Sequence, residues 1–200
     1  MTKRIAITGH SGVIGSEFLK KFKKFNYIKC KIDLTDRKKV YEWIKNERFD
    51  YFLHFAAIVS INQVIKKKKY AFKVNYNGTK NIIDALLKYK SKENIWFFFS
   101  STSHVYPLQN RKIKENFKTD PSSKYGKTKL LSENYIKKKF DKMQIKYCIG
   151  RIFSIFDNNQ EGFFKTDLSK KVKRKSKRLI LNNLNHNRDF LSTKQISEII

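Results

Sequence analysis

Short apolar runs alternate along the chain with segments whose apolar residues recur every three or four positions. The short runs indicate buried strands, and the longer periodicity indicates amphipathic helices. Strands that alternate with helices predict a parallel sheet covered by helices, with a ligand at the carboxyl ends of the strands. The expected strands are residues 4–8, 28–32, 51–55, 95–100 and 146–152, and the expected helices are residues 13–25, 37–47, 70–89 and 125–140.

This regularity fails after Arg151, where residues 156–178 are polar, basic and weakly patterned. We therefore predict a doubly wound α/β domain over residues 1–154 and a partial second lobe over residues 155–200. Ser192 or Thr193 is expected to cap a final helix that reaches Ile200 without a stop signal, as if the chain were cut inside it.

Three glycines follow the first expected strand directly. Gly9 permits a sharp turn, Gly12 allows the backbone to approach a pyrophosphate, and Gly15 allows the next helix to pack closely on the sheet. The pyrophosphate would lie on the amino-terminal amides of that helix. The spacing alone is a weak signal, but strand and helix flank it as a dinucleotide-binding turn requires.

The net charge is +28, from 45 Lys and Arg residues against 17 Asp and Glu residues. A basic surface of this kind makes nucleic-acid binding an alternative function. The charges lie in runs such as residues 66–69, 137–139 and 170–178, and runs of charge usually form a solvated surface. No nucleic-acid-binding motif accompanies them, so nucleic acid is not expected as a partner.

Cys30 and Cys148 lie in apolar, strand-like segments, which predicts buried thiols in a reducing compartment. Their spacing fits neither a disulfide framework nor a metal site. Met1 precedes the first strand by three residues, which leaves no room for a signal peptide, and no apolar run reaches the ~18 residues that span a bilayer. We predict a cytoplasmic protein without a bound metal.

Tyr125 and Lys129 are four residues apart and therefore share one face of an expected helix. A nearby ammonium group favours the phenolate, so this spacing can make an acid–base pair. The alternative is an exposed Tyr and Lys on a lysine-rich helix.

Together these motifs resemble the extended short-chain dehydrogenase/reductase family, also called the NAD-dependent epimerase/dehydratase family. The resemblance runs from Ile5 to about Phe190 and is nearest to nucleotide-sugar epimerases and 4-keto-sugar reductases. It implies a Rossmann-type fold whose second lobe binds the substrate. The motifs that carry it are the glycine turn, Phe55-Ala56-Ala57, Asn75, Ser100-Ser101-Thr102, the Tyr125/Lys129 pair, Arg151 and Arg188-Asp189-Phe190.

The resemblance also implies individual roles. Tyr125 would be the general acid/base, Lys129 would lower its pKa and hold the nicotinamide ribose, and Thr102 would align the sugar during hydride transfer. Cofactor contacts are expected from Gly9, Ser11, Gly12, Val13, Ile14, Gly15, Asp33, Leu34, Phe55, Ala56, Ala57, Asn75, Ser100, Ser101, Tyr125 and Lys129. Substrate contacts are expected from Thr102, Ser103, His104, Arg151 and Arg188. His10 and His54 are expected to be structural.

Two departures narrow the subfamily. Thr102 is followed by Ser103-His104 where sugar-nucleotide dehydratases carry Asp-Glu, which argues against a 4,6-dehydratase. The second strand-and-loop unit of the chain is shortened and is followed by Asp33-Leu34, and this region resembles that of the 4-keto-sugar reductases. No acidic residue ends the second strand, and Lys29 and Lys31 lie nearby, so the cofactor can be NAD or NADP.

The expected substrate is a nucleotide-activated sugar used in polysaccharide biosynthesis. The resemblance also implies a homodimer through helices 70–89 and 125–140, although lysines along both helices oppose it. Two alternatives stay open. One is a truncated or inactive family member that binds only the cofactor. The other is a basic nucleic-acid-binding protein on a Rossmann scaffold, because fold does not determine function.

Overall fold

The computed structural model describes residues 3–59, 64, 66–90, 93–109, 111–156, 168, 169, 172 and 188–200. Its centre is a five-stranded parallel sheet in the order β2-β1-β3-β4-β5. This sheet confirms the predicted α/β fold of the Rossmann type. The strands are β1 (Arg4–Thr8), β2 (Asn26–Lys29), β3 (Tyr51–His54), β4 (Trp96–Thr102) and β5 (Lys146–Ile152).

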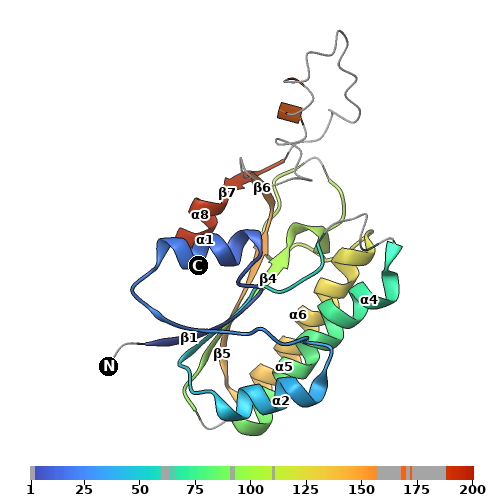
Figure 1. Cartoon of the computed structure of the whole chain (residues 1–200). Coiled ribbons are helices and arrows are strands. Elements are labelled where there is room, and N and C mark those ends of the chain that lie inside the picture. The colour runs from blue at the N-terminus through green and yellow to red at the C-terminus, as the bar shows by residue number, and fades with distance from the viewer. Residues whose placement is uncertain are drawn as a thin grey trace.

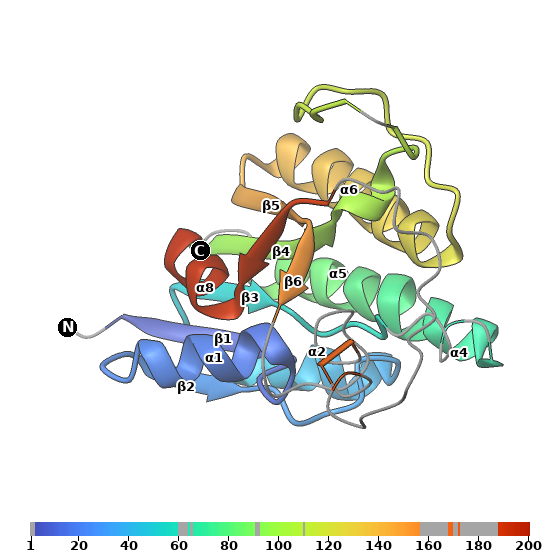
Figure 2. The same cartoon turned by 90° about the horizontal axis from the view of Figure 1, so that it is seen from above.

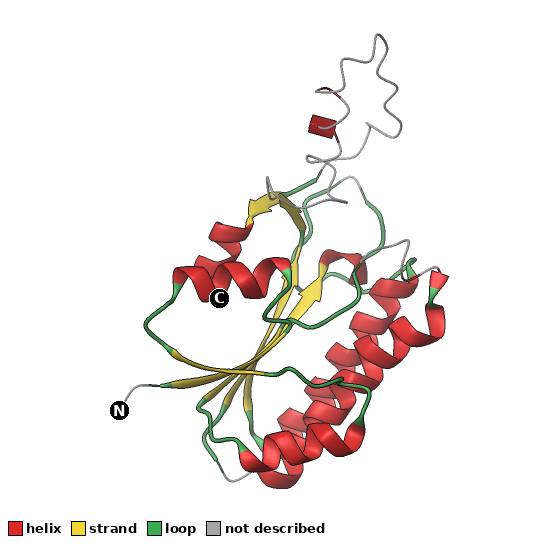
Figure 3. Ribbon diagram, in the orientation of Figure 1, coloured by secondary structure: helices red, strands yellow, loops and turns green. Residues whose placement is uncertain are grey.

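Helices cover both faces of the sheet (Figures 1 and 3). On one face α1 (Val13–Lys21) packs against α8 (Thr193–Ile199). On the other face lie α2 (Arg37–Asn46), α5 (Thr79–Tyr89) and α6 (Lys124–Met143). The chain moves outward from β1 to β2 and then back across β1 to β3, so right-handed crossovers place α1 opposite the later helices.

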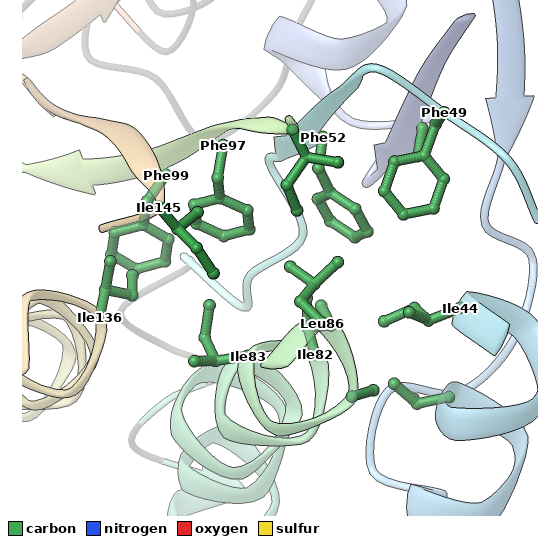
Figure 4. Close-up of a cluster of buried hydrophobic side chains, with 14 of the residues drawn as sticks. Ile44, Phe49, Phe52, Ile82, Ile83, Leu86, Phe97, Phe99, Ile136 and Ile145 are labelled. Atoms are coloured by element: carbon green, nitrogen blue, oxygen red, sulfur yellow. The ribbon is translucent and has the colours of Figure 1, made fainter. Parts of the chain in front are cut away.

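The main core fills the space between the sheet and the helices α2, α5 and α6 (Figure 4). Phe52 of β3 and Phe97 of β4 stack with ring centroids 5.5 Å apart. Ile44 and Leu86 close the core from α2 and α5 and have no exposed surface. Because these strands pack on rigid helices, their carboxyl ends are held in a fixed arrangement.

The expected helix over residues 70–89 is three consecutive segments. These are α4 (Lys68–Phe72), a π-helical segment (Lys73–Gly78) and α5. Within the π-helical segment, the Asn75 carbonyl oxygen accepts hydrogen bonds from the hydroxyls of Thr79 (2.7 Å) and Ser132 (3.1 Å). These side chains satisfy a backbone group at a helical irregularity that apolar periodicity does not reveal.

Several element ends differ from the expected positions. The first helix ends at Lys21 rather than residue 25, and β2 begins at Asn26 rather than residue 28. Two short strands, β6 (Ser154–Phe156) and β7 (Phe190–Ser192), were not expected and pair in parallel. Most of the expected insertion at residues 156–178 lies outside the described residues, so the division into two lobes stays a prediction.

The last helix begins as expected. The Ser192 hydroxyl accepts a hydrogen bond from the Gln195 amide at 3.2 Å, and the Gln195 side chain accepts one from the Ser192 amide at 2.9 Å. This capping box satisfies two amides that a helix start otherwise leaves unpaired. Figure 2 shows α8 beside α1.

One prediction about the thiols is wrong. Cys30 is buried as expected, but Cys148 is exposed. Cys148 lies on β5, which is the edge strand and whose amino-terminal residues alternate between exposed and half-buried positions. An apolar neighbourhood in sequence therefore does not ensure burial at the edge of a sheet.

In the part of the chain that the structure describes, no helix is long and apolar enough to cross a membrane. The same residues contain no group of three or more His, Cys, Asp or Glu side chains that could hold a metal ion.

Candidate functional site

The glycine turn lies where β1 ends and packs directly on the exit of β3. Gly9 has a φ of +68°, and a Cβ atom there would lie 2.5 Å from the Ala56 amide nitrogen. A Cβ atom on Gly15 would lie 2.3 Å from the Gly9 carbonyl oxygen. A side chain at either position would displace the backbone, so these two glycines determine the shape of the turn.

Gly12 is different, because a Cβ atom there would contact only the Gly9 oxygen, at 3.3 Å. Gly12 is the N-cap of α1, and among the described residues no side chain caps this helix end. The first amides of α1 are therefore free to bind an anion. His10 adds a buried Nδ1 atom without a hydrogen-bond partner in the described part of the chain. These features fit the pyrophosphate of a dinucleotide.

The remaining expected cofactor contacts near this turn vary in exposure. Ser11 is exposed, and Val13 and Ile14 are half-buried. Leu34 is buried in the main core, while the exposed Asp33 accepts a hydrogen bond from the Thr35 amide at 2.9 Å. The half-buried residues Phe55, Ala56 and Ala57 follow β3 directly.

His54, the last residue of β3, links β1 to α5 through hydrogen bonds at both ring nitrogens. Its Nδ1 atom lies 2.6 Å from the Thr8 hydroxyl, and its Nε2 atom lies 2.9 Å from the Thr79 hydroxyl. The Thr79 hydroxyl donates to the Asn75 carbonyl, so it accepts the proton of His54 Nε2. Complete burial lowers the pKa of His54 to about 3, which keeps the ring neutral. The expected structural role of His54 therefore has a physical basis.

Asn75 joins the π-helical segment to the loop after β3. Its side-chain oxygen accepts a hydrogen bond from the Ile58 amide at 2.7 Å, and its amide group donates to the Ile58 carbonyl at 3.0 Å. The same amide donates to the Thr128 hydroxyl on α6 at 3.4 Å. Asn75 therefore positions three elements around the candidate site, in addition to its expected cofactor contact.

The expected catalytic residues come together beyond β4. Thr102 ends β4, and its side chain interacts by a hydrogen bond with Tyr125 in the first turn of α6. Ser123 caps α6 by accepting a hydrogen bond from the Gly126 amide at 2.9 Å. Lys129 follows one turn later, and its ammonium nitrogen lies 4.2 Å from the centroid of the Phe99 ring.

Burial dominates the electrostatics of this pair. Burial raises the pKa of Tyr125 to about 12, and its hydrogen bond to Thr102 opposes that shift. Burial also lowers the pKa of Lys129 to about 7, while the charge of Glu133 acts in the opposite direction. The lowered Tyr125 pKa expected from the sequence is therefore not found, because desolvation outweighs the hydrogen bond to Thr102.

Glu133 is a buried residue that the sequence analysis missed. It has no exposed surface, and its carboxylate accepts hydrogen bonds from the Ser101 hydroxyl and from the Arg151 guanidinium, the shortest guanidinium contact being 2.7 Å. Arg151 also donates to the Tyr106 hydroxyl (2.6 Å) and the Glu115 carbonyl (3.0 Å). The only signal in the sequence for this residue was its position four residues after Lys129, on the same helical face.

The expected substrate residues border this centre. The rings of His104 and Tyr125 meet edge to face with centroids 5.8 Å apart. Burial lowers the pKa of His104, and the charge of Arg188 lowers it further. Arg188 comes from the segment before β7, so the tertiary structure brings it close to the residues after β4. Ser103 begins the short 3₁₀ turn that contains His104.

Residues 5–200 match the model of the NAD-dependent epimerase/dehydratase family. The chain belongs to this family. The family motifs identified in the sequence are thus present in a chain that matches the family over nearly its whole length.

Among family relatives, UDP-glucose 4-epimerase 2 of Oryza sativa is 31% identical over 105 residues, covering 52% of this chain and 25% of its own. The solved structure of UDP-glucose 4-epimerase with UDP-glucose from Thermotoga maritima has a TM-score of 0.83 at 20% identity, covering 98% of this chain and 71% of its own.

A dTDP-4-dehydrorhamnose reductase from Clostridium acetobutylicum has a TM-score of 0.83 at 23% identity, covering 98% of this chain and 68% of its own. The family fold therefore accommodates both epimerases and reductases. This chain spans about a quarter of the length of the rice relative and about seven tenths of the two solved structures.

Proposed function

We propose that this family member uses NAD or NADP to oxidise or reduce a carbon of a nucleotide-activated sugar, as a 4-epimerase or a 4-keto-sugar reductase. The observation that carries the proposal is the contact between Thr102 and Tyr125, one helical turn before buried Lys129. A hydroxyl pair beside a buried amine suits proton transfer to or from a sugar oxygen. The glycine turn, at the carboxyl edge of the same sheet, supports a dinucleotide beside them.

We assign a separate role in this reaction to each side chain of the site. When bound, the nicotinamide cofactor supplies the redox chemistry at the sugar carbon. Tyr125 holds the proton that the sugar oxygen gains or loses, and Thr102 orients that oxygen. Protonated Lys129 stabilises the phenolate of Tyr125. Because burial brings the pKa of Lys129 to about 7, the charge that stabilises this phenolate is lost as pH rises above neutrality.

The cofactor preference follows from the end of β2. In this fold the adenosine ribose binds near the end of the second strand. Lys29 ends β2, Lys31 follows it, and both side chains are exposed. A cation at this position attracts a 2′-phosphate, so we expect NADPH to bind at least as tightly as NADH.

Calorimetric titration of the chain with NADH and NADPH tests the cofactor site, at moderate salt so that nonspecific attraction to the +28 charge is suppressed. We expect saturable binding of both. Lys31→Glu should weaken NADPH binding about tenfold more than NADH binding, since it reverses the charge near the 2′-phosphate. Lys45→Glu on α2 is a matched control for loss of net charge. Absence of binding to the folded chain would overturn the proposal.

Activity is tested with UDP-glucose and with a nucleotide 4-keto sugar. Interconversion of UDP-glucose and UDP-galactose without net cofactor consumption identifies an epimerase. Cofactor oxidation that depends on the 4-keto sugar identifies a reductase. Bound cofactor with neither reaction, across a panel of nucleotide sugars, would identify a member that binds cofactor without turnover.

Three further expectations remain proposals. A homodimer through residues 70–89 and 125–140 would cover the exposed side chain of Leu131, but several exposed lysines lie on the same segments. A cytoplasmic location and a role in polysaccharide biosynthesis remain predictions from the sequence. Sedimentation at two salt concentrations tests the dimer, since charge repulsion weakens it most at low salt.

A further inference from the structure

Three ionisable side chains lie on successive turns of one face of α6. Tyr125, Lys129 and Glu133 are spaced by four residues each, and Lys129 and Glu133 are 2% and 0% exposed. An isolated buried charge is costly unless an opposite charge or hydrogen bonds compensate it. The proposed function assigns roles to Tyr125 and Lys129 but leaves buried Glu133 unexplained.

The carboxylate of Glu133 is fixed from two other elements. Ser101, next to Thr102 on β4, donates its hydroxyl to the carboxylate. Arg151 on β5 donates from Nε at 3.1 and 3.2 Å and from a terminal nitrogen at 2.7 Å. Arg151 and Glu133 form an ion pair, with a guanidinium nitrogen 2.7 Å from the carboxylate. Glu133 therefore presents a negative charge at a fixed place beside Lys129.

The other groups around Lys129 do not supply that charge. His54 on β3 is neutral because burial lowers its pKa to about 3, and Phe99 on β4 contributes only its ring. Tyr125 is protonated at neutral pH, because burial raises its pKa to about 12. Arg151 is positively charged, and it forms an ion pair with Glu133.

We propose that Glu133 is a positioning residue: its carboxylate, held by Ser101 and Arg151 one helical turn after Lys129, keeps Lys129 charged inside the protein. The electrostatic part of this inference stands on the described residues, and its consequence for turnover rests on the proposed function. With Lys129 charged, the phenolate that forms when Tyr125 gives up its proton during turnover is stabilised. Without the negative charge of Glu133, Lys129 becomes neutral at a lower pH and that stabilisation is lost.

The first test measures the titration of Lys129 directly, by following lysine Cε and Nζ signals by NMR between pH 5 and 11. Lys129→Arg identifies the signal by its disappearance. Glu133→Gln keeps the side-chain shape but removes the charge, so we expect the Lys129 midpoint to fall by about one pH unit or more. Asp84→Asn is the matched control, because it removes a carboxylate on α5 that pairs with Lys80 and should leave Lys129 unchanged.

A second variant guards against misfolding, since Glu133→Gln alone leaves the Arg151 charge unpaired. The double variant Glu133→Gln/Arg151→Met removes both charges, and we expect the Lys129 midpoint to fall less than in Glu133→Gln, because loss of the Arg151 cation acts in the opposite direction. An unchanged midpoint in whichever of the two variants folds, by circular dichroism, would overturn the proposal.

The consequence for turnover is read from the pH profile of kcat. We expect the loss of activity on the alkaline side to move to lower pH in Glu133→Gln by the same interval as the Lys129 midpoint, with no such movement in Asp84→Asn. A purely structural role would lower kcat at every pH without moving the profile. A shifted Lys129 midpoint in a protein with no turnover would support the electrostatic inference while overturning the proposed function.

Discussion

The glycine turn between β1 and α1 and the buried face of α6 contribute to one candidate site by different physical means. The turn offers backbone amides and close approach, and its tip residues Ser11 and Gly12 are exposed. The α6 face offers ionisable side chains, of which Lys129 and Glu133 are almost wholly buried. The properties of the turn therefore depend on local geometry, whereas those of the α6 face depend on everything packed around it.

Substitutions in the turn and on the α6 face should have different effects. Changes in the turn that leave its backbone in place should act mainly on binding, because backbone amides hold an anion regardless of pH. Changes on the α6 face should act on proton transfer and on pH dependence, because burial controls the pKa values there.

The largest expected effect is that of Tyr125→Phe. Removal of the hydroxyl should lower kcat about 10²–10⁴-fold, because proton transfer by a positioned side chain contributes that much. Steady-state kinetics and cofactor titration on the same preparation measure the two properties. Cofactor affinity should stay within a few-fold of the original, and unchanged turnover would remove Tyr125 from the reaction.

Two glycine substitutions distinguish positions that determine the backbone shape of the turn from positions that the cofactor approaches. Gly15→Ala should destabilise the fold by about 1–3 kcal/mol, because its Cβ atom overlaps backbone that cannot move freely. Gly12→Ala meets only one atom at 3.3 Å, so it should keep the fold and weaken cofactor binding. Urea unfolding and calorimetry measure both. Equal effects of the two variants on stability would contradict the difference between these positions.

His54 should make stability depend on pH. The pKa of His54 falls from its usual value to about 3 on folding, so the unfolded chain gains a proton below pH ~6.5 that the folded chain does not. Below that pH this residue should cost ~1.4 kcal/mol of stability per pH unit. His54→Gln should be less stable at pH 7, and its difference from the original chain should narrow toward pH 5. A constant difference would show that His54 titrates normally.

The smallest expected effect is at the start of α6. Ser123→Ala removes the side chain that accepts the Gly126 amide hydrogen bond, and loss of such a cap typically costs about 1 kcal/mol. Thermal unfolding measures the loss. Turnover should change little because Tyr125 stays in the first turn, and Ser122→Ala, at a neighbouring exposed position, serves as the control.

The sequence predicted the glycine turn well because most of its geometry is local, although Gly9 also packs on Ala56 after β3. The φ of Gly9 and the close contact of Gly15 are consequences of chain geometry within seven residues. The π-helical segment around Asn75 could not be predicted, since hydroxyls from Thr79 and from Ser132 on another helix satisfy its carbonyl. The exposure of Cys148 likewise follows from the position of β5 at the edge of the sheet.

The candidate site also combines features that the sequence predicted with features that depend on the tertiary structure. Spacing predicted that Tyr125 and Lys129 share a helical face, and the family resemblance implied Thr102. The structure brings Thr102 of β4 to Tyr125 and Arg188 near His104. The role of Glu133 depends on Ser101 and Arg151, which lie 32 and 18 residues away in sequence.

The sequence by itself determined the alternation of strands and helices, the glycine turn and the order of the family motifs, because each depends on periodicity or on residues close together in the chain. Only the tertiary structure decided which side chains are desolvated and which charges face them. Burial raises the pKa of Tyr125 and lowers that of Lys129, and neither shift is encoded in the spacing of the two residues. Desolvation depends on all the atoms that surround a group, and those atoms come from distant parts of the chain.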